Sequence, residues 1–76
     1  MATFVKHAIH EHDVVALTQP VAAVETSGTW AAGTEGTVVN EVGEHKLIEI
    51  ANDQGEALDF ISQTEDKLQL ISKHSR

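Results

Sequence analysis

The sequence predicts a small all-β domain, a sheet of five short strands curled into a barrel. Two observations lead to this prediction. Gly33 and Gly36 run into the β-branched triplet at 37–39, which is typical of a turn that feeds a strand. Short apolar segments also recur along the chain, and clusters of turn-forming residues separate them. A barrel would also hide the strand edges of so short a chain.

Length and composition restrict the classes of protein to consider. A chain of 76 residues has room for one domain with a small core. The absence of cysteine excludes disulfides, thiolate zinc sites and cysteine nucleophiles, and we expect a cytoplasmic protein. No stretch approaches the roughly 18 apolar residues of a membrane helix, and the N-terminus lacks an export signal pattern. We therefore expect no membrane partner.

The N-terminal part is predicted to contain a lead-in and the first strand. Residues 1–12 are expected to be loosely ordered, with Ile9 anchoring them to the core. The segment 13–17 reads as a strand in which Val15 and Leu17 share one face.

The longest irregular segment follows this strand. Pro20 ends the strand because it has no N–H to donate to a ladder. Residues 21–32 are too apolar for a purely solvated loop, so we expect two short arms joined by a turn at 26–28. Trp30 is expected to pack back on the barrel, either as a lid on the core or as a binding anchor.

The next two strands are predicted at 36–42 and 46–51. Gly43 lies between them and supplies the unusual φ of a hairpin turn. Ile48 and Ile50 alternate along the third strand and are expected to face the core.

A second hairpin turn is predicted at 52–55, where turn-forming residues end in a glycine. The fourth strand then covers 56–61. Its alternation places Leu58 and Phe60 on the core face and Asp59 on the opposite, solvated face.

The C-terminal part is predicted to contain one helical turn and the last strand. The segment 62–65 matches the S-x-x-E capping box, so a helical turn should begin at Ser62. The last strand is expected at 68–71, which closes a domain of residues 13–71, and 72–76 should be a flexible tail. The predicted core consists of Val38, Ile48, Ile50, Leu58, Phe60 and Leu68.

This element order is that of an SH3-like barrel, and an OB-like barrel is the alternative. The chain also resembles a family of small bacterial SH3-like domains of unknown function over almost its whole length. The matching positions are 13–17, 30–33, 36–39, 48–50, 53–55 and 66–70. The resemblance implies a fold and no established catalytic residues. Because some members are encoded beside small toxin-like proteins, it suggests a partner that the domain neutralises.

A second resemblance concerns the Gly-x-x-Gly-x-Val core at 33–38. It is similar to the KOW motif of ribosome- and RNA-associated proteins. Charge argues against carrying that function over. The net charge is −7, and between Lys6 and Lys46 stand six acidic residues and no Lys or Arg. Nucleic-acid binding needs a positive track, so we expect none, and a basic protein is the better fit.

The N-terminal histidines are the candidate metal ligands. His7, His10 and His12 stand close together, and in an extended chain His10 and His12 would point to the same side. A small metal- or ligand-binding protein is therefore the alternative function. We expect that no metal or other cofactor is bound, because a structural metal site requires three or four ordered ligands.

The leading hypothesis is a non-enzymatic module that binds a protein. No serine lies in a Gly-x-Ser-x-Gly context, and no pair of carboxylates can be argued to converge in a pocket. The partner is expected to be a basic, toxin-like protein or a second copy of the chain. The predicted contact residues are Val21, Val24, Glu25, Trp30 and Glu35.

Overall fold

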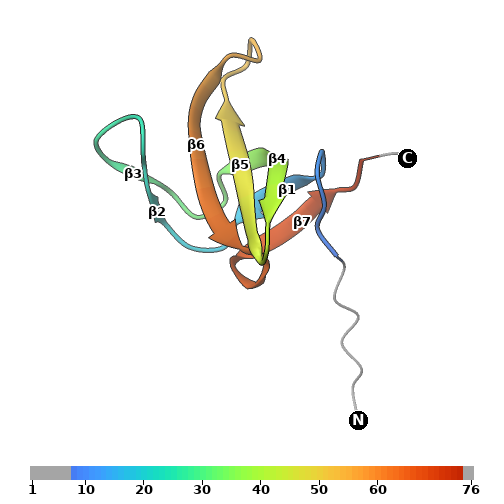
Figure 1. Cartoon of the computed structure of the whole chain (residues 1–76). Coiled ribbons are helices and arrows are strands. Elements are labelled where there is room, and N and C mark those ends of the chain that lie inside the picture. Colours follow the sequence, from blue (N-terminus) through green and yellow to red (C-terminus); the bar gives the residue numbers. More distant parts are fainter. Residues whose placement is uncertain (1–7, 75–76) are drawn as a thin grey trace.

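The computed structural model describes residues 8–74 (Figure 1). This part of the chain contains seven β-strands and one 3-10 turn. The strands are β1 (Val14–Leu17), β2 (Val21–Ala22), β3 (Thr29–Trp30), β4 (Glu35–Val42), β5 (His45–Ala51), β6 (Ala57–Thr64) and β7 (Leu68–Ser72). The 3-10 turn is Glu65–Lys67. The all-β prediction is confirmed.

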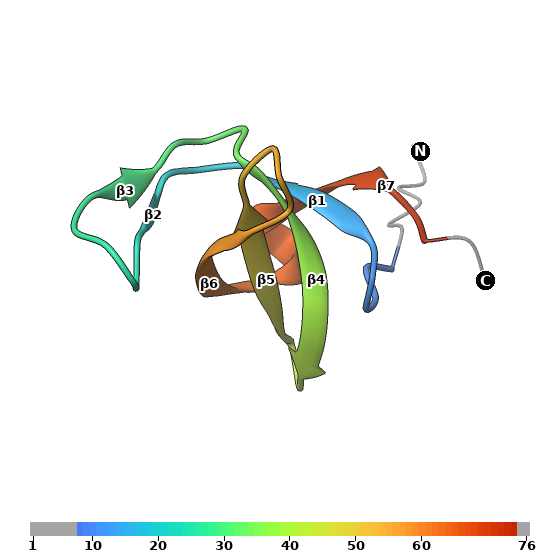
Figure 2. The same cartoon turned by 90° about the horizontal axis from the view of Figure 1, so that it is seen from above.

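Five of these strands form one antiparallel sheet in the order β6-β5-β4-β1-β7. Among residues 8–74, the strands β2 and β3 pair only with each other and build a hairpin, residues 21–30, which we call the arm. Figure 2 shows the arm projecting to one side of the sheet. The sheet is not closed, so β6 and β7 are its two edges.

The stretch around Gly33 and Gly36 brings the chain from the arm into β4. Gly33 has a φ of +92° in the turn that precedes the strand, where the Thr34 amide donates to the Ala31 carbonyl at 3.1 Å. Gly36 lies inside β4 and has no positive φ. A Cβ at this position would come within 2.5 Å of Ile48 Cγ2 and 2.7 Å of the Glu49 carbonyl oxygen. Glycine is therefore required there because two strands approach closely, not because of a turn.

Both predicted hairpin turns are confirmed. Gly43 has a φ of +61° in the tight turn between β4 and β5. In the turn between β5 and β6, the Asn52 side-chain oxygen accepts from the amides of Gln54 and Glu56, at 3.0 and 2.9 Å. Gly55 has a φ of +82° in the same turn. The polar side chain of Asn52 thus satisfies turn amides that have no ladder partner.

The core lies on the inner face of the sheet. Its buried members are Ile9, Val15, Leu17, Val38, Ile48, Ile50, Ile61 and Leu68. Ile9 anchors the N-terminal segment as expected, and the predicted inward faces of β1 and β5 are confirmed.

The predicted orientation of β6 is wrong. Leu58 and Phe60 are 43% and 40% exposed, whereas Asp59 and Ile61 are buried. The cause is the register, because Ile61 lies opposite Ile48 in β5, and this pairing turns the odd-numbered residues of β6 inward.

The predicted start of the helical turn is also wrong. Ser62 belongs to β6, and the 3-10 turn begins at Glu65 after Thr64, whose side chain makes no capping bond. The Glu65 carboxylate accepts from the Ile9 amide at 2.9 Å, so it ties the N-terminal segment to the sheet. Within residues 8–74, no helix has the length and apolar character to cross a bilayer.

The residues that follow Ile71 make contacts with the start of the described chain. Ser72 is the last residue of β7. Lys73 and His74, expected in a flexible tail, both bond to the carboxylate of Asp13. A buried carboxylate next to β1 needs donors, and the residues after β7 provide them.

Candidate functional site

The arm is fastened to the sheet by one buried carboxylate, that of Asp59 on β6. Asp59 Oδ2 accepts from the Trp30 indole Nε1 and from the Val24 amide, each at 2.8 Å. Asp59 Oδ1 accepts from the Glu25 amide at 3.1 Å and from the Phe60 amide at 2.8 Å. Each oxygen therefore takes two donors, and three of the four donors come from the arm.

This arrangement keeps Asp59 ionised. The hydrogen bond from the Trp30 indole is the chief cause that lowers the pKa of Asp59, against the opposing effect of burial. The backbone amides of Val24, Glu25 and Phe60 lower it further. The sequence-based argument placed Asp59 on the solvated face and so missed this role. A signal was present, since a half-buried tryptophan N–H needs an acceptor.

The arm itself has the predicted form. Val21 pairs with Trp30, and the Ala23 amide donates to the Gly28 carbonyl at 3.1 Å across the turn. Val21 and Trp30 are half-buried and pack against the core. Trp30 is thus a lid on the core whose indole N–H is also part of the contact with Asp59.

The structure divides the five predicted contact residues into two groups. Val24 is 68% exposed and Glu25 is exposed, and both follow β2 in the arm. Val21 and Trp30 lie beneath them against the core. Glu35 is exposed at the start of β4, opposite Ala16 of β1 and outside the arm. Contact with a partner stays a prediction for all five.

A second buried carboxylate, Asp13, joins the two ends of the described chain. It accepts from the His10 amide at 2.9 Å, the His74 amide at 2.7 Å and Lys73 Nζ at 3.2 Å. Lys73 Nζ also donates to the Ala8 carbonyl at 2.8 Å. Burial alone would raise the pKa of Asp13, but the two amides and the Lys73 ammonium lower it well below its usual range.

The candidate metal ligands do not come together. His10 Nδ1 lies 3.4 Å from Glu41 Oε1, whereas the His12 ring lies against His74, with ring centroids 5.1 Å apart. The chain turns at this point instead of running extended, and His12 has a φ of +75°. Among residues 8–74, no three His, Cys, Asp or Glu side chains are arranged to hold a metal ion. His7 lies outside the described residues.

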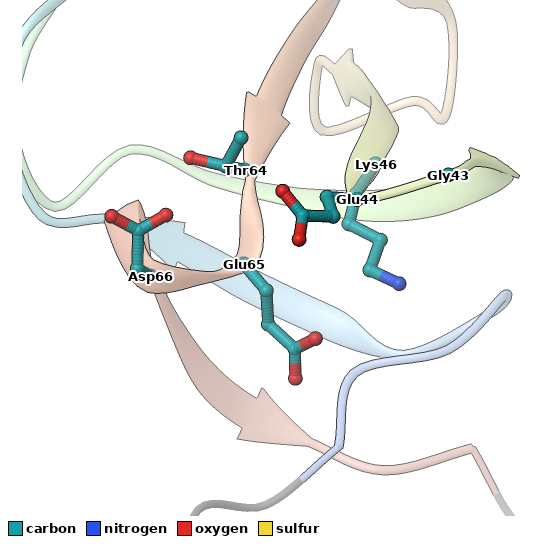
Figure 3. A pocket seen from close by; sticks show the side chains of 6 residues that line it. All are labelled: Gly43, Glu44, Lys46, Thr64, Glu65 and Asp66. Atoms are coloured by element: carbon teal, nitrogen blue, oxygen red, sulfur yellow. The ribbon is translucent and has the colours of Figure 1, made fainter.

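A polar pocket of about 440 Å³ lies between the β4–β5 turn and the end of β6 (Figure 3). It is lined by Gly43, Glu44, Lys46, Thr64, Glu65 and Asp66. Lys46 is buried and donates from Nζ to Glu41 Oε1 at 2.7 Å, which lowers the pKa of Glu41. The carboxylates of Glu65 and Asp66 point in different directions in Figure 3. The pocket therefore does not direct its charged groups at one reacting atom.

Comparisons with known proteins identify no relative of this chain. No family model matches the chain, and neither the curated proteins nor the solved structures contain a match. The function has to be inferred from the residues themselves.

The buried carboxylates predict a loss of stability in acid. Asp13 and Asp59 have folded-state pKa values below the unfolded value of about 3.9, so the folded state binds fewer protons than the unfolded state. Their stabilising contribution is complete above about pH 4 and is lost as pH falls from there through the folded-state values. Urea titrations between about pH 7 and pH 2 should therefore show midpoints that fall mainly below pH 4.

The variants Asp13→Asn and Asp59→Asn provide the control for this pH dependence. Each should lower the midpoint at neutral pH and flatten the fall in acid, because an amide does not titrate. An unchanged acid dependence in the double variant would show that other carboxyls cause it, with Glu41 the first to examine.

Proposed function

We propose that this chain is a non-enzymatic interaction module that binds a basic protein through the exposed side of the arm. The contact with Asp59 carries the proposal. It holds the backbone of Val24 and Glu25 in place from below, while the side chains of both residues are exposed. A surface fixed before binding loses less conformational entropy when a partner arrives.

The distribution of charge supports a basic partner. Of the three lysines among residues 8–74, Lys46 is paired with Glu41 and Lys73 with Asp13. Exposed carboxylates such as Glu25 and Glu35 make no ion pair within this part of the chain. An exterior with an excess of unneutralised acids attracts and steers a basic protein.

The proposal includes the finer assignment of the fold. Three features support an SH3-like barrel: five strands in the order β6-β5-β4-β1-β7, an arm between β1 and β4 in the chain, and a 3-10 turn before β7. On this assignment the chain is a cytoplasmic relative of small bacterial SH3-like domains, and a toxin-like protein that it neutralises is a candidate partner. The fold itself does not select a function, so the surface has to do so.

Catalysis and cofactor binding have no part in the proposal. The two buried carboxylates, Asp13 and Asp59, already accept several structural hydrogen bonds each. Such groups are poor candidates for proton transfer, because a general base must be within reach of a substrate proton.

The test is the capture of basic proteins from the native host by the immobilised domain. The double variant Val24→Asp with Glu25→Lys should reduce capture about tenfold, the effect of losing a strong contact at an interface. The control is Val42→Asp, which changes a valine that is 67% exposed at the end of β4, beside the β4–β5 turn. Equal capture by the double variant and the native chain, or equal loss in the control, would contradict the proposal.

A further inference from the structure

We propose that the open edge of β6 binds an extended, basic segment of the partner as an additional strand. The inference rests on the proposed function, because it takes a basic protein as the partner. It goes further by naming the surface that binds the segment. It also names the chemistry of the segment, which has apolar residues at alternate central positions and Lys or Arg at the ends.

Part of the backbone of β6 has no neighbouring strand on its outer side. The strand is eight residues long, stands at the edge of the sheet, and pairs only with β5 among the described residues. The Phe60 amide already donates to the carboxylate of Asp59 at 2.8 Å, so it is not available to an added strand. The register with β5 is regular from Asp59 to Thr64, so by strand alternation the N–H and C=O groups of Ser62 face the same open side as the Phe60 carbonyl. These groups are the hydrogen-bonding partners that an added strand uses.

The side chains of β6 do not protect this edge. Proteins usually block an exposed edge with lysines, proline, a bulge or a very short strand. A register shift between Asp59 and Ala57 leaves Leu58 as a bulge near the start of β6, and from Asp59 to Thr64 the pairing with β5 is regular. The exposed residues of this regular part, Phe60 and Ser62, are uncharged, and the strand contains no proline. The part of the edge after this bulge, from Asp59 to Thr64, is therefore the part suited to strand addition.

The opposite edge of the sheet provides a contrast. The strand β7 has five residues, and a lysine stands at each end, Lys67 before it and Lys73 after it. Its pairing with β1 is interrupted by a register shift between Val14 and Val15. The two edges thus differ in length and in flanking charge, while each contains one register shift.

Leu58 and Phe60 provide apolar contacts on the outer face of β6. They are 43% and 40% exposed and stand two residues apart, so their side chains point the same way. An added strand would place every second side chain beside them, and apolar or aromatic pairs across neighbouring strands are favourable. The half-buried Leu47 of β5 continues this face behind Ser62.

Charge decides which occupant fits. Glu49 lies opposite Phe60 on the outer face and makes no ion pair among residues 8–74. Glu25 stands beside β6, because its amide bonds to Asp59, and Asp53 and Glu56 precede the strand. A second copy of the chain, with a net charge of −7, would bring the same acids to this edge. Lys and Arg residues at the ends of an incoming segment would neutralise them instead.

The experiment uses the full chain and a synthetic peptide with Lys-Arg at each end of an alternating Val-Thr stretch. In NMR titrations, the peptide should shift the amides of Leu58, Phe60 and Ser62 and slow hydrogen exchange on β6. Affinity should fall as salt is raised, because the ends bind by charge. Two control peptides should not bind: one with acidic ends, and one with proline in the centre, which cannot donate to the edge.

Two chain variants locate the site. Phe60→Lys should weaken peptide binding about tenfold or more, because it removes an apolar contact from the edge and places a positive charge there. Ile71→Lys is the matched control, since Ile71 is 45% exposed on β7. The affinity of this variant for the peptide should equal that of the native chain. Urea midpoints of both variants check that the fold is intact.

Three results would overturn the inference: no peptide binding, amide shifts confined to the arm, or sedimentation showing a dimer that Phe60→Lys dissolves. The last would mean that a second copy occupies the edge. The proposed function fails differently, through capture of basic proteins that does not depend on Val24 and Glu25. If the Val24→Asp, Glu25→Lys variant loses capture of basic proteins but the peptide does not bind at β6, the proposed function stands and this inference is rejected.

Discussion

Replacing Gly36 with alanine should destabilise the domain by about 2–3 kcal/mol, the cost of forcing an extra group into a packed position. The new Cβ would stand 2.5 Å from Ile48 Cγ2 and 2.7 Å from the Glu49 carbonyl oxygen. A side chain can rotate, but the Glu49 carbonyl belongs to the backbone of β5, so β4 and β5 would have to separate. Small domains have only about 5–15 kcal/mol of stability, so a large part of it would be lost. Urea titrations followed by the fluorescence of Trp30 measure the change.

Gly43→Asn is the matched control for the glycine prediction. Gly43 has a φ of +61°, a left-handed conformation that asparagine tolerates, and nothing lies within 4 Å of an added Cβ. Its urea midpoint should therefore remain close to that of the native chain. If Gly36→Ala were as stable as this control, the close approach of β4 and β5 would not be a constraint on the fold.

Gly36 also shows how far sequence reasoning reaches. The pattern of two glycines before a β-branched triplet located the turn and the strand correctly. The reason assigned to the second glycine was wrong, because of these two glycines Gly33 has a positive φ and Gly36 does not. Whether a glycine serves a turn or a close approach depends on the strand lying beside it, and one sequence does not contain that distance.

The orientation of β6 failed for a related reason. The segment has apolar residues in both phases, Leu58 and Phe60 in one and Ile61 in the other. Alternation favoured the pair, but the register against β5 put Ile61 opposite Ile48. Local pattern therefore predicted that a strand exists here, while pairing between strands decided which face is buried.

The candidate site was predicted in part. Apolar residues in a loop that is otherwise rich in turn formers predicted the arm, with its two short strands and their turn. They also predicted that Trp30 packs against the core. The two buried aspartates were missed, because an acidic residue is normally expected at the surface. Each is buried since several donors from distant segments meet at it, and such long-range convergence leaves little trace in a sequence.

Changing Asp59 to asparagine should release the arm while leaving the sheet folded. Each carboxylate oxygen accepts from two N–H donors. Asparagine offers one oxygen, and its NH₂ group would face the other two donors, so half of the contacts become repulsive. We expect the Trp30 emission to shift to longer wavelength and the amides of Val24 and Glu25 to exchange with solvent about tenfold faster or more, as for a locally opened segment.

The measurement separates release of the arm from unfolding. The amides of Ile48 and Ile61 lie in the paired strands β5 and β6 and should keep their protection if only the arm opens. Asp53→Asn is the control, because Asp53 is exposed in the β5–β6 turn and is not among the residues that bond to the arm. Unchanged emission and exchange in Asp59→Asn would mean that packing of Val21 and Trp30 on the core holds the arm without the carboxylate. If the arm opens, capture of basic proteins should fall with it, because Val24 and Glu25 would still be present but no longer held in one place.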